Sequence, residues 1–173
     1  MIMDEADVLR SMKRITHEII EKNNGADDII LLGIHRRGMP LAAMLKENIR
    51  SFEGTDVPLG SIDISLYRDD LTLIGELPET GMTVIPCDIS GKKVILVDDV
   101  IYTGRTVRAA IEAVFSHGRP QSIQLAVLID RGHRELPIRP DYVGKNIPTS
   151  HSEVVSVMVD EFDGKTGVAL YQR

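Results

Sequence analysis

Hydrophobic residues near the start of the chain recur at the spacing of an α-helix. They lie four, three and four positions apart, which places them on one face of a helix predicted over residues 5–23: Val8, Met12, Ile15 and Ile19. Asp4 stands where a capping residue is expected, and Gly25 can end the helix. We therefore expect an amphipathic first helix that packs on the body of the protein.

Short, continuous apolar runs occupy residues 29–34, 94–97 and 123–129. Such runs are typical of strands that are buried on both faces of a parallel sheet. Residues with helical spacing follow the first two runs, beginning at Pro40 and after Thr103. Strands that alternate with helices predict an α/β fold with a mainly parallel central sheet flanked by helices. Ligands of such sheets bind beyond the carboxyl ends of the strands, so the polar residues after each run form the candidate site.

Residues 69–92 carry no clean periodicity and contain Gly75, Pro78, Gly81 and Pro86. A loop of this length is usually a mobile lid or a disordered segment.

The length of 173 residues suits one domain over residues 1–173. The single cysteine, Cys87, excludes an internal disulfide and fits a reducing compartment. The N-terminus is acidic and amphipathic and lacks the organisation of a signal peptide. No apolar run approaches the roughly 18 residues of a spanning helix. These features predict a cytoplasmic protein without a membrane partner.

The net charge of −6 and the pI of about 5.3 count against nucleic-acid binding, because such proteins usually carry a basic excess. A local basic face stays possible, since a phosphate feels charges within a Debye length of about 8 Å.

The segment Val94–Arg108, VILVDDVIYTGRTVR, contains the most informative chemistry of the chain. Asp98 and Asp99 end a buried strand, where two carboxylates need strong partners such as ligand hydroxyls, a metal or basic side chains. A helix begins directly after them, and the unpaired amides of a helix start suit a phosphate. Acids that can bind a diol, next to a phosphate cradle, predict a ribose 5-phosphate site.

Other nucleotide-binding patterns are missing from the sequence. It contains neither the G-x-x-x-x-G-K-[ST] P-loop nor the G-x-G-x-x-G dinucleotide fingerprint. The histidines are not spaced as zinc ligands. The remaining structural alternative is a capped helix after a strand whose two aspartates are merely solvated.

The stretch VILVDDVIYTGRT resembles the phosphoribosyl pyrophosphate (PRPP) signature of the type I phosphoribosyltransferases. The resemblance implies that Asp98 and Asp99 bind the ribose hydroxyls, and that the loop after them binds the 5-phosphate. Tyr102 stands where some purine-using relatives carry a carboxylate base, which places purines in doubt. The implied substrate-binding residues of this segment are Asp98, Asp99, Val100, Ile101, Tyr102, Thr103, Gly104, Arg105 and Thr106.

Further stretches are similar to one subgroup, the bifunctional pyrimidine operon attenuation regulators with uracil phosphoribosyltransferase activity. The matching text is RIxHEIIE at 14–21, GIHRRG at 33–38, DISLYRDDL at 63–71 and a long block at 118–150. This resemblance implies a small hood and a flexible lid loop beside the sheet. Two positions depart from the subgroup, because Lys13 and Arg36 each stand where threonine is common; both changes add positive charge.

The same resemblance assigns roles to three other segments. Residues 33–38 would hold pyrophosphate, with Arg37 as the charged catalytic contact beside Asp98 and Asp99. Mg²⁺ is implied as the cofactor and would be held mainly through PRPP, with no metal ligands from the chain. The other implied contacts to PRPP, uracil or UMP are Arg36, Gly38, Arg68 at the start of the lid, Asp130, Arg131, Ile147, Pro148 and Thr149.

Two basic groups form the predicted RNA-binding surface. The first lies on one side of the first helix, opposite its apolar stripe, and the second lies in the late block. By composition alone these would be solvated surface charges, whereas in the regulators that this chain resembles a dimer presents them to a stem-loop of pyrimidine operon mRNA. UMP in the active site is then expected to strengthen RNA binding, and the chain to form a homodimer or higher homo-oligomer. The groups are Arg10, Lys13, Arg14 and His17, and His133, Arg134, Arg139 and Lys145.

Two alternatives stay open at the level of sequence. The first is a phosphoribosyltransferase for another base, such as orotate or hypoxanthine, with no RNA role. The second is a regulator that no longer catalyses the reaction.

Overall fold

A computed structural model describes residues 1–65 and 83–173 of the chain. Arg68 and most of the loop predicted over 69–92 lie outside the described residues. Within the part of that loop that is described, Val84 forms an antiparallel bridge with Ser61. No helix among the described residues is both long and apolar enough to cross a membrane.

Five parallel strands form the central sheet in the order β2-β1-β3-β4-β5, which confirms the predicted α/β class. Three of them contain the apolar runs at 29–34, 94–97 and 123–129. The strands are β1 (Ile29–Ile34), β2 (Leu59–Ile62), β3 (Lys93–Ile101), β4 (Ser122–Asp130) and β5 (Tyr142–Asn146).

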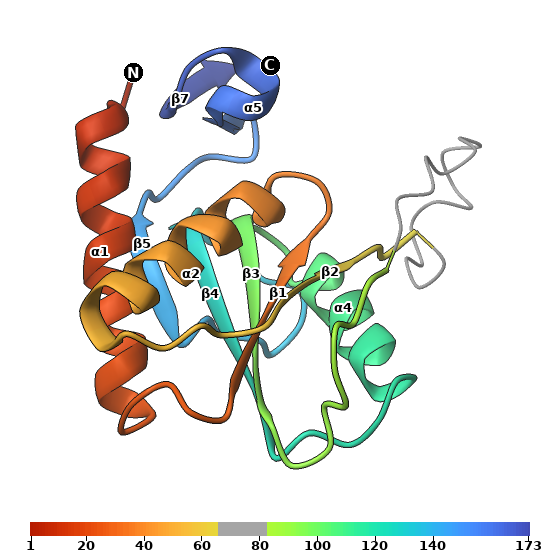
Figure 1. Cartoon of the computed structure of the whole chain (residues 1–173). Coiled ribbons are helices and arrows are strands. Elements are labelled where there is room, and N and C mark those ends of the chain that lie inside the picture. Colours follow the sequence, from red (N-terminus) through yellow and green to blue (C-terminus); the bar gives the residue numbers. More distant parts are fainter. Residues whose placement is uncertain (66–82) are drawn as a thin grey trace.

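Helices cover both faces of this sheet, which explains why its inner strands are continuously apolar. The helices α1 (Glu5–Lys22) and α2 (Gly38–Glu53) lie on one face, where they pack on Ile95 and Val97 of β3. The helix α4 (Arg105–Phe115) lies on the other face with Val94 and Leu96 (Figure 1). Successive side chains of β3 therefore pack alternately into two separate hydrophobic cores.

The first helix confirms the sequence prediction closely. Its stripe of four apolar residues is buried, and Asp4 caps its start in a reciprocal pair with Asp7. The helix ends at Lys22, one residue before the predicted end, and Gly25 follows with a φ of +111°.

Two predicted boundaries were wrong. The second helix begins at Gly38, two residues before Pro40, because proline needs no amide partner in a first turn. The strand β3 continues through both aspartates to Ile101, because Asp98 and Val100 pair with Val127 and Ile129 of β4. The acids thus lie inside the strand and do not end it.

A second, smaller unit stands beyond the carboxyl ends of the sheet (Figure 1). It consists of the antiparallel strands β6 (Glu153–Met158) and β7 (Gly167–Gln172), joined through the short helix α5 (Asp160–Asp163). Met3 pairs with Val168 of β7, which ties the N-terminus to this unit. It corresponds to the expected hood.

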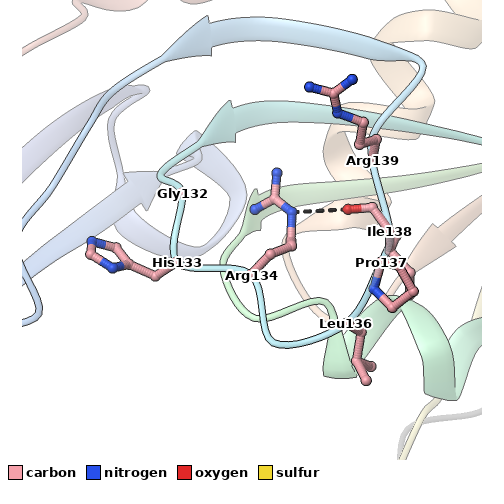
Figure 2. Close-up of a pocket in the computed structure, with 7 residues that line it drawn as sticks. All are labelled: Gly132, His133, Arg134, Leu136, Pro137, Ile138 and Arg139. Atoms are coloured by element: carbon pink, nitrogen blue, oxygen red, sulfur yellow. Dashed lines mark hydrogen bonds between the residues drawn. The ribbon is translucent and has the colours of Figure 1, made fainter.

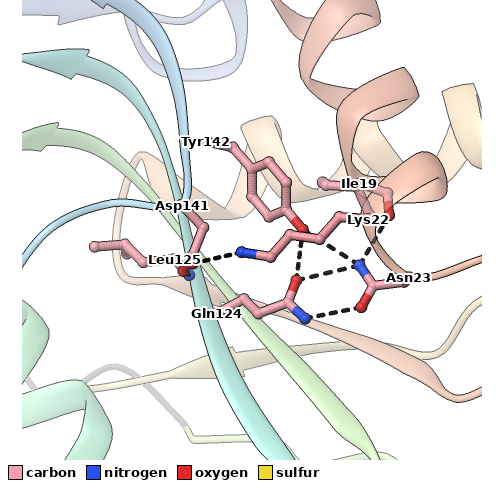
Figure 3. Close-up of polar contacts among 7 residues, drawn as sticks. All are labelled: Ile19, Lys22, Asn23, Gln124, Leu125, Asp141 and Tyr142. Carbon is pink, nitrogen blue, oxygen red and sulfur yellow. Dashed lines mark hydrogen bonds and ion pairs between the residues drawn. The ribbon is translucent and has the colours of Figure 1, made fainter.

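A buried polar cluster joins the end of α1 to the edge of the sheet (Figure 3). The Gln124 amide donates to Asn23 Oδ1 over 2.8 Å, and the Tyr142 hydroxyl donates to Gln124 Oε1 over 2.6 Å. Burial, the largest influence, raises the pKa of Tyr142 to about 12. Outside the cluster, Lys22 pairs with Asp141. These contacts fix how α1 lies against β4 and β5.

We expect the Tyr142→Phe variant to lower the free energy of unfolding by about 1 kcal/mol, since it leaves the buried Gln124 acceptor with one donor fewer. Urea denaturation at neutral pH measures this loss. The matched control is Tyr171→Phe, because Tyr171 is exposed, and its free energy of unfolding should stay within about 0.5 kcal/mol of the parent. Equal stabilities for the two variants would contradict the account of the cluster.

Candidate functional site

The carboxyl ends of three neighbouring strands bring the predicted site segments together. The pairing of Gly33 with Val97 sets the loop after β1 beside the acids of β3. The pairing of Ile101 with Asp130 sets the end of β4 next to the segment that follows those acids. The residues expected to hold pyrophosphate, ribose phosphate and base therefore share one edge of the sheet.

The two aspartates of β3 differ in their surroundings. Asp98 is only 7% exposed, whereas Asp99 is half-buried. Asp98 Oδ1 accepts the backbone amide of Asp99 over 2.9 Å, and Asp99 Oδ1 accepts that of Val100 over 2.8 Å. Burial, followed by the neighbouring Asp99 charge, raises the pKa of Asp98 well above its usual range. Hydroxyl donors of a ligand would strongly stabilise the charged form of such a buried carboxyl group.

A cavity of about 380 Å³ lies at the start of α4. Residues 100–107 and Glu135 line it, so it contains the whole predicted phosphate loop. Gly104 caps the helix with a φ of +94°, a conformation that glycine adopts without strain. The Thr103 hydroxyl accepts the Arg105 amide over 3.3 Å. Helix-start amides, threonine hydroxyls and Arg105 give this cavity the chemistry of an anion site.

The loop after β1 lies directly against the acids. A Cβ atom on Gly38 would stand 2.3 Å from the Val97 carbonyl oxygen, so only glycine fits there. Arg37 pairs with Asp163 over 2.9 Å, yet its Nε is buried and has no hydrogen-bond partner among the described residues. Arg36 is exposed and stacks on Phe162 at 4.4 Å. The peptide bond between His35 and Arg36 is cis. A buried donor without a partner is unusual, which makes this loop a candidate contact for a ligand.

The residues predicted to frame the base are also brought together. Arg131 is buried and donates to the Thr149 hydroxyl over 3.1 Å, while its guanidinium lies 3.9 Å from the ring centre of Tyr102. The Asp130 carbonyl accepts the amide of Ile147 over 2.9 Å. Pro148 is exposed beside them.

The first basic group lies on the exposed side of α1, as predicted, and Lys145 of β5 joins it. Arg10, Arg14 and Lys145 line a shallow cavity of about 320 Å³ together with Asp7. Arg14 donates to the backbone oxygens of residues 143 and 144, which ties α1 to β5. Lys13 is exposed, and His17 stacks on Phe52 with ring centres 4.3 Å apart.

The second basic group is divided in the structure. His133, Arg134 and Arg139 line a separate cavity of about 450 Å³ on the segment after β4 (Figure 2), whereas Lys145 lies with α1. Arg134 is held within the fold, because it donates to the carbonyls of Tyr102 and Ile138 and pairs with Asp130. His133 contacts the Thr149 carbonyl. Arg139 is the exposed cation of the three.

Two contacts of the site were missed at the level of sequence. Glu135 pairs with Arg105 over 3.0 Å inside the cavity at the start of α4, although the matching block 118–150 had contained it without a role. Phe162 contacts Arg36, and Asp163 pairs with Arg37, which is 126 residues earlier in the sequence. No local pattern could have indicated the second contact.

Among residues 1–65 and 83–173, no group of three or more histidine, cysteine or acidic side chains is arranged to hold a metal ion.

Comparisons with known proteins agree with this geometry. The family model described as phosphoribosyl transferase domain matches residues 1–161. The bifunctional protein PyrR of Acetivibrio thermocellus is 60% identical over 169 residues, covering 98% of this chain and 92% of that protein. The bifunctional protein PyrR of Clostridium novyi is 57% identical, and the match covers 100% of this chain and 97% of that protein. Among solved structures, a hypoxanthine phosphoribosyltransferase from Trypanosoma cruzi superposes with a TM-score of 0.77 at 22% identity, covering 100% of this chain and 94% of that one. This likeness concerns the fold alone.

Proposed function

This chain belongs to the phosphoribosyl transferase domain family, and we propose that it transfers ribose 5-phosphate from PRPP to uracil, giving UMP and pyrophosphate. The observation that carries the proposal is the pair Asp98–Asp99 near the carboxyl end of β3, next to the anion cavity at the start of α4. A ribosyl phosphate needs both features at this spacing, since its diol and its phosphate lie on opposite sides of one sugar ring.

Each part of the site has a role in the transfer. The two carboxylates accept the ribose hydroxyls and orient C1 of the sugar towards the base. Residues 103–106 hold the 5-phosphate at the helix start. Arg37, with its unpaired buried Nε, stabilises the charge that develops on the leaving pyrophosphate. The reaction needs no nucleophilic side chain, because the base itself attacks C1.

Mg²⁺ belongs to this proposal as a cofactor that is held mainly through the oxygens of PRPP. Magnesium commonly binds substrate phosphates and water in this way, and it neutralises charge on the leaving group. The site fits a metal held in this way, because the carboxylates of Asp98 and Asp99 place negative charge beside the loop that would hold the diphosphate.

Uracil is proposed as the acceptor. Tyr102 stands where some purine-using relatives carry a carboxylate base. The relatives of 57% and 60% identity are named bifunctional PyrR proteins. Arg131 donates a hydrogen bond to Thr149 and stacks on Tyr102. In this position it would line the binding site of the base, between β4 and residues 147–149.

A spectrophotometric screen tests the acceptor. With PRPP and Mg²⁺, uracil should be converted to UMP, while orotate and hypoxanthine under the same conditions should give no product. Turnover of hypoxanthine in place of uracil would overturn the choice of base, and no turnover of any base would indicate a regulator without catalysis.

The second half of the proposal is RNA binding. Two observations support it: the relatives are named bifunctional, and the exposed cations of α1 and β5 gather at one cavity. We propose that a homodimer or higher homo-oligomer of this one-domain chain, located in the cytoplasm, binds a stem-loop of pyrimidine operon mRNA and promotes transcription attenuation when UMP fills the site. Linkage then requires RNA to tighten UMP binding by the factor by which UMP tightens RNA binding.

We expect the Lys145→Ala variant to weaken binding of the mRNA stem-loop and to reduce the slope of log affinity against log salt concentration by about 1, because one phosphate contact is lost. Gel-shift titrations with UMP at several salt concentrations measure both quantities. The matched control is Lys165→Ala, since Lys165 is an exposed lysine between α5 and β7. Equal slopes for both variants would remove Lys145 from the RNA surface.

A further inference from the structure

The phosphate loop and the segment after β4 are joined at four consecutive residues of the loop. The Tyr102 carbonyl accepts Arg134 over 2.9 Å, and the Thr103 carbonyl accepts the amides of Glu135 and Leu136 over 2.9 and 3.2 Å. An added Cβ on Gly104 would touch Leu136 at 3.5 Å, so this glycine packs against the segment. Arg105 then pairs with Glu135. A displacement of the phosphate loop would therefore displace the segment after β4, and the reverse.

Glu135 is the one member of this junction whose charge opposes a ligand. Its carboxylate lies in the cavity proposed for the 5-phosphate and is bound there to Arg105, a cation of that cavity. An incoming phosphate would compete for Arg105 and repel the carboxylate, since like charges in one small site are unfavourable. The pair is about half exposed, with side-chain exposures of 39% and 53%, so exchanging one partner for another is not costly.

The same segment also carries cations of the proposed RNA surface. Arg134 and Arg139 line the cavity of about 450 Å³ shown in Figure 2, whereas Glu135 lines the cavity at the start of α4. The Arg134 Nε donates to the Ile138 carbonyl over 2.9 Å and thereby fixes the shape of the loop. The segment 132–139 thus has its acidic residue at the phosphate cavity and its basic residues at a second cavity.

We propose that Glu135 is the switch between the two sites: the 5-phosphate of bound UMP takes Arg105 from Glu135 and frees the segment 132–139 to adopt the form that binds RNA. This inference rests on the proposed function and adds the residue through which the nucleotide acts. Without nucleotide, the Arg105–Glu135 pair adds to the Tyr102 and Thr103 contacts that hold the segment against the phosphate loop. With nucleotide, the carboxylate leaves the cavity, and Arg134 and Arg139 are repositioned together.

Hydrogen–deuterium exchange on the full chain tests the displacement without RNA or turnover. UMP and inorganic phosphate should each speed exchange of the Glu135 and Leu136 amides, which are bonded to the Thr103 carbonyl, by about threefold or more. Uridine, which lacks the phosphate, should leave their rates unchanged. In the Glu135→Gln variant these amides should exchange fast before any ligand is added, and UMP should bind about fivefold tighter because the opposing charge is gone.

The matched control is Glu112→Gln, which removes the carboxylate of a comparable ion pair, with Arg108, one turn further along α4 and outside the cavity. It should respond to UMP as the parent does. If UMP binds Glu135→Gln with the parent affinity, and the amides respond to UMP as in the parent, the switch is wrong while the proposed function stands. If the parent binds UMP with the expected exchange but neither forms UMP nor binds RNA, the proposed function fails and the displacement stands.

A gel shift completes the test. The parent should bind the mRNA stem-loop more tightly with UMP, whereas Glu135→Gln should bind it without UMP about as tightly as the parent does with UMP. Weaker RNA binding by Glu135→Gln under both conditions would overturn the proposal, since it would make Glu135 a plain structural support.

Discussion

Replacing Asp98 and Asp99 together by asparagine is expected to lower the rate of UMP formation by about two to four orders of magnitude. Each carboxylate is proposed to accept a hydroxyl of the ribose, and hydrogen bonds to charged groups contribute about 1.5–3 kcal/mol each. Steady-state assays with uracil, PRPP and Mg²⁺ measure the loss. Turnover at the parent rate would refute the assignment of the pair.

The Asp98→Asn change alone should also stabilise the free protein, which separates loss of activity from loss of fold. Burial holds the pKa of Asp98 well above its ordinary value of 3.8, so the native state binds this proton more tightly than the unfolded state does. Stability is therefore lost as the pH rises from about 4 through the raised pKa. Asparagine removes the cost of burying an ionised carboxylate. The Tm of the Asp98→Asn variant at pH 7 should therefore equal or exceed that of the parent, and this difference in Tm should disappear near pH 4.

The Gly38→Ala variant is expected to lose about 2–4 kcal/mol of stability, the second large effect. Its new Cβ would stand 2.3 Å from the Val97 carbonyl oxygen, which belongs to the central strand and cannot move aside. The helix α2 and the loop that holds Arg37 must shift instead, so the KM for PRPP should rise in any molecules that fold. Urea denaturation measures the stability.

Gly54→Ala is the matched control at the other end of the same helix. Gly54 has a φ of +71° but no atom within 4 Å of an added Cβ, so alanine there pays only for the backbone conformation, about 1 kcal/mol. A loss at Gly38 no larger than the loss at Gly54 would show that the close approach of α2 to β3 has no energetic weight.

The sequence predicts those elements whose signals are local. The cap at Asp4, the stripe of α1 and the three apolar runs all follow from neighbouring residues, and the structure confirms them. The end of β3 was misplaced because two aspartates look like a strand terminator. Backbone pairing with β4 continues the strand through them, and no local pattern contains that partner.

The same limit applies to the site. The segments 33–38, 98–106 and 130–131 could be found, because each one follows an apolar run and the topology of a parallel sheet gathers such ends. The pairing of Arg37 with Asp163 and of Arg105 with Glu135 depends on how separate elements fold over that edge. The division of the second basic group has a similar cause, since Lys145 lies in β5 beside α1 and not with the loop of Arg139.

A crystal structure of the chain with bound UMP tests the central claim most directly. The account predicts the ribose hydroxyls within hydrogen-bond distance of Asp98 and Asp99, and the 5-phosphate in the cavity formed by residues 103–106 at the start of α4. UMP bound in another cavity, with this edge of the sheet empty, would contradict it.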